Sequence, residues 1–139
     1  MATSDLTSVM AVASSGLRAQ STRMKVVAEN IANAATTPSA PGEMPYQRQV
    51  VTFKNEFDRA LGVYEVKVSG VEKDKSDFIK KYDPSHPAAD AEGYILTPNV
   101  KPILESMDMH EAQRSYEANI NVIESARSML LRTIDLLKN

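Results

Sequence analysis

The chain has 139 residues, a formal net charge of −2 and no cysteine. A near-neutral chain without a basic cluster lacks the charge that binding to nucleic acid or to an acidic membrane surface uses. The absence of cysteine excludes disulfides, cysteine-ligated metals and a thiol nucleophile. The length allows one ordinary domain, or a small domain combined with long helices.

A long helix is predicted over residues 3–36, because apolar positions recur there in alternating steps of four and three, with Gln20 in the one polar slot. The stripe consists of Leu6, Met10, Ala13, Leu17, Met24, Val27, Ile31 and Ala34. The other faces carry mainly Ser, Thr and Ala, whereas a solvated helix face is normally charged. One interpretation is an Ala-rich helix of high intrinsic propensity. The other is a helix buried on more than one side, for which we expect other subunits.

Three prolines and one glycine at residues 38–45 end this helix. Residues 46–97 then indicate a small, mostly β part. A short strand is expected at 47–53, and a stronger one at 63–70, where Tyr64, Val66 and Val68 alternate with polar residues. Residues 78–82 are expected to pair with this second strand across the charged turn 72–77. A last short apolar piece lies at 94–96.

A second long helix is predicted from about residue 99 to 139. Its stripe follows the same heptad steps and consists of Tyr116, Ile120, Ile123, Leu130, Ile134 and Leu137. Such a helix would be about 50–60 Å long at about 1.5 Å per residue. Because that is too long for a compact domain of this size, we expect a partner along most of its length.

These patterns predict a mainly α fold with a small β part. The long N- and C-terminal helices pack as an antiparallel coiled coil, with a small insert that contains a β-hairpin between them. The expected helical domain combines residues 1–36 with 99–139, and residues 37–98 form a turn and a small β-rich outer module.

No pattern of catalytic residues is present. His86 lies in a loop with Asp83, Asp90 and Glu92, which could in principle ligate a divalent ion, but the spacing matches no metal motif. His110 is predicted to lie on a helix surface. No Gly-x-Ser-x-Gly elbow and no Gly-rich phosphate loop occur. We therefore expect no enzymatic activity, no metal and no cofactor or small-molecule ligand.

The N-terminus lacks the pattern of a cleaved signal, and no stretch reaches the roughly 20 apolar residues of a membrane span. Taken alone, this predicts a cytoplasmic chain unless another export route exists. The first helix could also lie on a membrane surface, but its polar face lacks the Lys and Arg enrichment of such helices.

The run from Val27 to Ala34, which contains Asn30 and Asn33, leads through a turn to Tyr46. It resembles the N-terminal signature of bacterial flagellar axial proteins of the rod and hook class. The run from Ser115 to Thr133, which contains Asn119, is similar to the other signature helix of that family. Residues 82–87, 91–94 and 98–100 resemble the proximal rod members, whose middle part is also short. The Pro-rich turn 36–45 is longer than the usual family form, so its conformation stays open.

The resemblance implies a structural subunit whose terminal helices pack as the inner layer of a helical tube, with the β part outside. Such a tube crosses the periplasm and transmits motor torque. The implied partners are other copies, other rod proteins and, in transit, the flagellar type III export apparatus, which exports such chains without a cleaved signal. No nucleic acid and no direct membrane insertion are implied.

We assign the subunit interface to the two heptad stripes. Its expected residues are Leu6, Met10, Leu17, Met24, Val27, Ile31, Tyr116, Ile120, Ile123, Leu130, Ile134 and Leu137. The alternative is a soluble coiled-coil adaptor or chaperone of a secretion system, which would use the same helices as a stable small oligomer.

Overall fold

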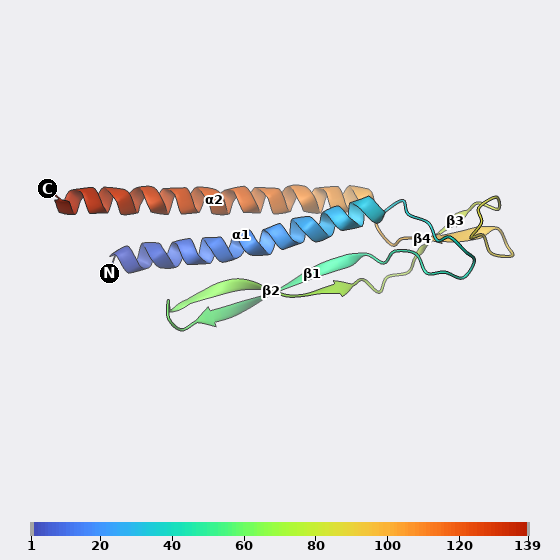
Figure 1. Ribbon diagram of the computed structural model, residues 1–139, viewed down its shortest axis with the longest axis horizontal. Helices are drawn as coiled ribbons and strands as arrows, with labels where there is room; N and C mark the ends of the chain where they lie inside the picture. Colours follow the sequence, from blue (N-terminus) through green and yellow to red (C-terminus); the bar gives the residue numbers. More distant parts are fainter. Residues whose placement is uncertain (1, 139) are drawn as a thin grey trace.

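The computed structural model describes residues 2–138, and the side chains of residues 5–136. In order, these residues form α1 (Ala2–Asn33), β1 (Gln49–Asp58), β2 (Val63–Lys73), β3 (Ile79–Tyr82), β4 (Tyr94–Thr97) and α2 (Pro102–Lys138). The two helices lie side by side and run in opposite directions, so both chain ends lie at the same end of the molecule (Figure 1). The predicted fold class, two long packed helices with a small β part between them, is confirmed.

Both helices are slightly shorter than predicted. α1 ends at Asn33, where the N–H of Ala34 donates to the carbonyl of Ile31 in a tightened last turn. α2 begins at Pro102, a residue that suits the first helical position because no intrahelical partner exists there for an N–H.

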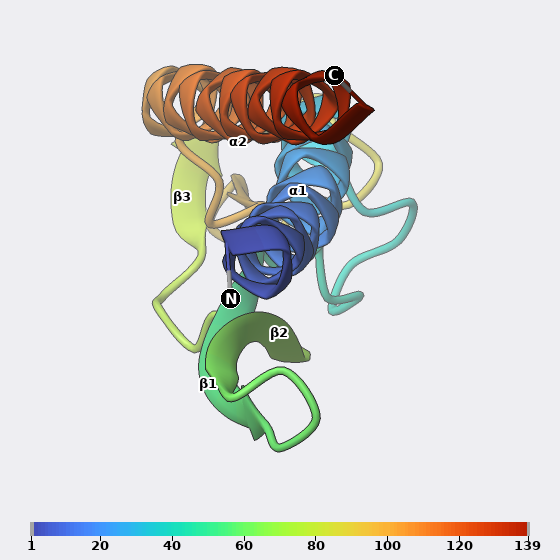
Figure 2. The same cartoon turned by 90° about the vertical axis from the view of Figure 1, so that its left-hand side faces the viewer.

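The β1–β2 hairpin lies along α1, on the side opposite α2 (Figure 2). Ser15 of α1 is 1% exposed, and its Oγ accepts a hydrogen bond from the N–H of Val66 at 3.1 Å. The chain itself thus covers α1 on a second side. The small-residue faces of this helix therefore do not by themselves require other subunits.

The predicted pairing of residues 78–82 with the second strand is also wrong. β2 pairs antiparallel with β1. The pairing begins with Gln49 opposite Lys73 and ends with Asp58 opposite Val63, whereas β3 pairs with β4. β1 continues to Asp58, five residues beyond the predicted end of the first strand at residue 53. The short loop 59–62 then closes the hairpin locally, with Asp58 Oδ1 accepting the N–H of Ala60 at 2.7 Å.

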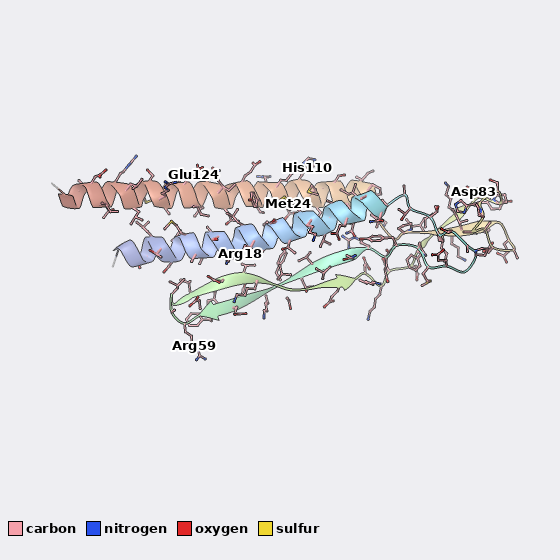
Figure 3. The ribbon with its side chains drawn as sticks, in the orientation of Figure 1. Arg18, Met24, Arg59, Asp83, His110 and Glu124 are labelled. Carbon is pink, nitrogen blue, oxygen red and sulfur yellow. The ribbon has the colours of Figure 1, made fainter. Side chains whose placement is uncertain are left out.

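The β3–β4 sheet lies at the far end of the molecule from the chain termini (Figure 1). The rings of Tyr82 and Tyr94 stack edge to face at 5.2 Å across it. Gly93 has a φ of 84°, and a Cβ there would lie 3.0 Å from the Tyr82 ring, so this turn requires glycine. Figure 3 shows Asp83 in the adjoining loop and Arg59 at the opposite tip of the β1–β2 hairpin.

Several of the most buried residues on the two helices are small. Ala13 and Ala19 of α1 and Ala112 and Ala126 of α2 are almost completely buried. Gly16 lies directly against Asn119, because a Cβ at Gly16 would be only 2.9 Å from Asn119 Nδ2. Small side chains at the contact permit this close helix approach. Over the described residues, neither helix is apolar enough for long enough to cross a bilayer.

Candidate assembly surfaces

A group of polar side chains joins the end of α1, the start of β1 and the start of α2. This junction cluster consists of Asn30, Tyr46, Arg48, Asp74, Asn99 and Glu105. Asn30 is 0% exposed, and its Nδ2 donates to Glu105 Oε2 at 2.9 Å and to the carbonyl of Gln49 at 2.8 Å. Its Oδ1 accepts from Tyr46 Oη and from the N–H of Gln49, both at 2.9 Å. One buried amide is thereby fully satisfied by three segments.

The Glu105 carboxylate is the most deeply buried charge of the junction cluster. Its side chain is 1% exposed, and its Oε1 lies 2.5 Å from Arg48 Nε. Arg48 also reaches Asp74 at 3.3 Å. Burial works to lower the pKa of Arg48, but the hydrogen bonds to Glu105 and Asp74 and their charges outweigh it, so that this pKa is raised. Loss of Arg48 would leave the buried Glu105 carboxylate without its ion-pair partner, which is costly.

Asn99 ties the strand and loop segments together just before α2. Its Oδ1 accepts the N–H of Arg48 at 2.7 Å, and its Nδ2 donates to the carbonyls of Asp74 at 3.1 Å and Ser76 at 3.0 Å. Burial, with Glu29 nearby, raises the pKa of Tyr46 and keeps its phenol protonated as a donor. The junction cluster therefore fixes how the helix pair leaves the β part.

The four residues of the family motif fall into two environments. Asn30 and Tyr46 lie in the junction cluster. Asn33 instead donates to the carbonyl of Glu29 at 2.8 Å, and Asn119 to that of Ser115 at 2.9 Å, each within its own helix. Asn119 additionally faces Gly16 across the helix pair.

The predicted interface stripe is partly covered within the single chain. Val27 is buried, and Ile31 and Ile134 are exposed. The half-buried members are Leu6, Met10, Leu17, Met24, Tyr116, Ile120, Ile123 and Leu130. The side chain of Leu137 lies outside the described residues.

Sequence reasoning missed a second apolar stripe on α2. We name it the exposed stripe, and it consists of Ile103, Leu104, Met107, Val122, Met129 and Leu136. At 3.6 residues per turn, these positions fall within an arc of about 100°. They were overlooked because the heptad pattern was assigned to one face only, although the close spacing of Ile103, Leu104 and Met107 is a readable signal. Exposed apolar stripes of this kind mark contact sites for partners.

Comparison with known proteins decides the family. Residues 10–38 match the family described as flagella basal body rod protein, and residues 91–136 match the C-terminal family of flagellar basal body rod FlgEFG proteins. The flagellar basal-body rod protein FlgC of Agrobacterium fabrum is 49% identical over 133 residues, which cover 96% of each chain. FlgC of Bacillus subtilis is 37% identical over 142 residues, covering 91% of this chain and 95% of its own. The chain belongs to the FlgC family of flagellar basal-body rod proteins.

FlgC of Salmonella typhimurium is 37% identical over 131 residues, covering 94% of this chain and 97% of its own. Membership of the FlgC family makes the chain a structural component of the flagellar basal-body rod, which acts in motility, and not an enzyme. It also decides against the soluble secretion adaptor. The two family matches cover most of α1 and, from the other end, β4 with α2.

The two histidines of this FlgC-family chain lie apart. His86 Nε2 lies 3.1 Å from Thr37 Oγ1, and its Nδ1 accepts the N–H of Ala88. His110 is exposed on α2 (Figure 3). Asp90, which we considered as a metal ligand, accepts the N–H groups of Glu92 and Tyr94. Over the described residues, no group of three or more His, Asp or Glu side chains could hold a metal ion.

Proposed function

We propose that this FlgC-family chain is a subunit of the proximal part of the rod. It assembles through its terminal helices into a helical tube that crosses the periplasm and transmits motor torque. The observation that carries the proposal is the exposed stripe of α2, whose apolar side chains the chain itself leaves exposed at the start and in the second half of a 37-residue helix. A heterologous contact through such a stripe generates a helical filament if its rotation does not close.

The proposed partners are further copies of the chain and other rod proteins. The inner domain consists of residues 1–36 and 99–139, and residues 37–98 form the outer module. The predicted interface residues act mainly where the single chain leaves them open, as at Ile31 and Ile134. The exposed stripe adds the contacts that the heptad pattern did not include.

Export by the flagellar type III apparatus, without a cleaved signal, is part of the same proposal. Such export favours a chain whose helices become fully ordered only when the subunit is incorporated into the rod. Ordering a long amphipathic helix costs conformational entropy, and without a partner the helix buries too little apolar surface to offset that cost. The junction cluster holds one end of each helix, so the opposite ends are the ones that order last.

Electron cryotomography of cells from which the gene is deleted tests the proposal, with the intact gene restored as control. We expect basal bodies that stop at the inner-membrane ring and carry no shaft across the periplasm. Complete rods in the deletion strain would contradict it. A shaft that stops partway across the periplasm would contradict the proximal position.

A further inference from the structure

One edge of the β1–β2 hairpin is open. Asn30 bonds both the N–H and the carbonyl of Gln49, so these groups face away from β2. β1 carries no extra residue, since the register shift between Thr52 and Phe53 places Ser69 as the additional residue on β2. Alternate residues of an antiparallel strand direct their backbone groups the same way. The N–H and carbonyl groups of Phe53, Asn55 and Phe57 therefore also face outward from β1.

A second observation gives the same orientation independently. The N–H of Val66 bonds Ser15, so Val66 and its partner Asn55 form a pair that is not hydrogen-bonded to each other. α1 thereby covers the outer edge of β2 at this point, and not that of β1. Phe57 is 48% exposed, and Lys54 and Asn55 are exposed as well. Among residues 5–136, where backbone and side chains are both described, no hydrogen bond to this edge of β1 is found between Phe53 and Phe57. An uncovered edge of this kind is a template for another strand.

The charges on the hairpin are mismatched within one chain. The register places Lys54 directly opposite Lys67 and Glu56 directly opposite Glu65, and like charges in such positions are destabilising. Within the chain, the attractive ion pairs that offset this repulsion are made with neighbouring positions. Glu56 lies 2.5 Å from Lys67 Nζ on the diagonal and 3.3 Å from Lys54 Nζ along its own strand.

We propose that a second copy of the chain pairs with this edge, β1 against β1, in an antiparallel register centred on Asn55. The sequence Phe53-Lys-Asn-Glu-Phe57 is complementary to itself in this register. Lys54 lies opposite Glu56 of the second copy, and Phe53 opposite Phe57. Phe53, Asn55 and Phe57 enter hydrogen-bonded pairs, each of which exchanges two N–H···O bonds. Lys54 and Glu56 occupy the closer, non-hydrogen-bonded pairs, where opposite charges attract most strongly.

The pair belongs to the unassembled chain. A two-fold contact uses the same surface on both copies and closes on itself, so it does not propagate into a filament. It also leaves the exposed stripe of α2 free. This inference therefore goes beyond the rod assembly and does not depend on it. The contact protects an edge that is otherwise open to non-specific strand pairing.

Sedimentation velocity of the full-length chain over a range of concentrations tests the pair. We expect a reversible dimer whose association is weakened at least about tenfold by Lys54→Glu or by Glu56→Lys, because like charges then face each other between copies. Within one chain, each substitution creates an opposite-charge pair, with Lys67 or with Glu65, so the hairpin itself stays folded. An equimolar mixture of the two variants should restore the dimer, because the charges match again between unlike copies.

Lys81→Glu on β3 is the matched control, because it makes the same charge change at an exposed site away from the edge. A second measurement uses the absence of natural cysteine. Asn55→Cys should oxidise to a disulfide-linked dimer, whereas Lys81→Cys should not, since only position 55 faces itself across the two-fold axis. A wild-type chain that stays monomeric, association that survives both single variants, or a mixture that stays dissociated would each overturn the proposal.

Discussion

The amide of Asn30 has partners on three segments of the chain. It bonds the Glu105 carboxylate, the Tyr46 phenol and both backbone groups of Gln49. Each of these groups would lose this partner if the amide were removed, and at the Glu105 carboxylate, which is 1% exposed, water could not readily replace it. The conformation of the helix end is therefore determined by one side chain more than by the local sequence around it.

Asn30→Ala should lower the free energy of unfolding by about 2–4 kcal/mol. A buried polar group left without a hydrogen bond costs about 1–3 kcal/mol, and the substitution removes a bond from more than one such group. Urea denaturation followed by circular dichroism measures the change. The control is Asn33→Ala, which removes a partly exposed bond within one helix and should cost less than about 1 kcal/mol. Equal losses for the two variants would show that the junction cluster does not stabilise the fold.

Asp74 gives the fold a dependence on pH. The N–H of Ser76 and the Arg48 guanidinium hold the pKa of the Asp74 carboxyl below its ordinary value. A carboxyl with a lowered folded-state pKa stabilises the fold above its unfolded-state pKa of about 3.9, and this stabilisation is lost as the pH falls through the folded-state pKa. Asp74→Asn should therefore be less stable than the wild type at pH 6, and the difference should shrink below about pH 4. A difference that stays constant from pH 6 to pH 3 would contradict this assignment.

At the scale of elements, the sequence predicted the helices and strands that show a periodic pattern of apolar residues. The heptad steps located both helices to within a few residues, and the alternation of Tyr64, Val66 and Val68 located β2. The partner of β2 was missed because the first strand was predicted only as far as Phe53 and residues 78–82 were assigned as the partner of β2. In the structure Lys54 and Glu56 occupy one face of a strand whose alternation continues, and the Asp58 turn closes the hairpin.

The junction cluster could not be predicted from local pattern. Asn30 and Glu105 are 75 positions apart, and Arg48 and Glu105 are 57 apart. A periodicity argument treats Glu105 as an ordinary acidic residue in the first turn of a helix, which favours the helix dipole and is usually solvated. Its burial follows only from the tertiary arrangement that brings α1, β1 and α2 to one point.

Protection against hydrogen exchange should vary along α2. Its first part is held by the junction cluster and by the ion pair between Arg23 and Asp108. Its last part carries the exposed residues Met129, Leu131 and Leu136. In the dilute, free chain we expect slow amide exchange at residues 104–112 and fast exchange at 125–138, because the helix end far from the junction cluster opens most easily. Exchange followed by mass spectrometry measures this, and in assembled rods both parts should be protected. Uniform slow exchange along α2 in the free chain would contradict ordering on incorporation.

At the scale of the whole molecule, the elements form a stack with α1 in the middle, α2 on one side and the β1–β2 hairpin on the other (Figure 2). α1 is therefore covered from two sides, whereas α2 is covered from one. This asymmetry places the open apolar surface on α2. It also distinguishes substitutions at half-buried positions of α2, which affect folding, from substitutions on its exposed stripe, which do not; a heptad argument alone would treat them alike. Half-buried Leu130 contributes to the folded chain itself, so Leu130→Asp tests folding and assembly together.

The exposed stripe allows assembly to be tested apart from folding. Leu104 and Met107 are exposed, the latter to 63%, so the double substitution Leu104→Glu with Met107→Glu removes little buried surface. Its free energy of unfolding should stay within about 0.5 kcal/mol of the wild type, as expected for surface sites. If α2 packs against neighbouring subunits, two charges would then be buried without partners, and rods should be absent and the cells non-motile. Motility in soft agar and electron cryotomography measure the outcome.

Lys80→Glu with Lys81→Glu, two exposed changes on β3, is the matched control and should leave motility intact. Normal rods in the Leu104 and Met107 variant would place the contacts between subunits elsewhere than on this stripe.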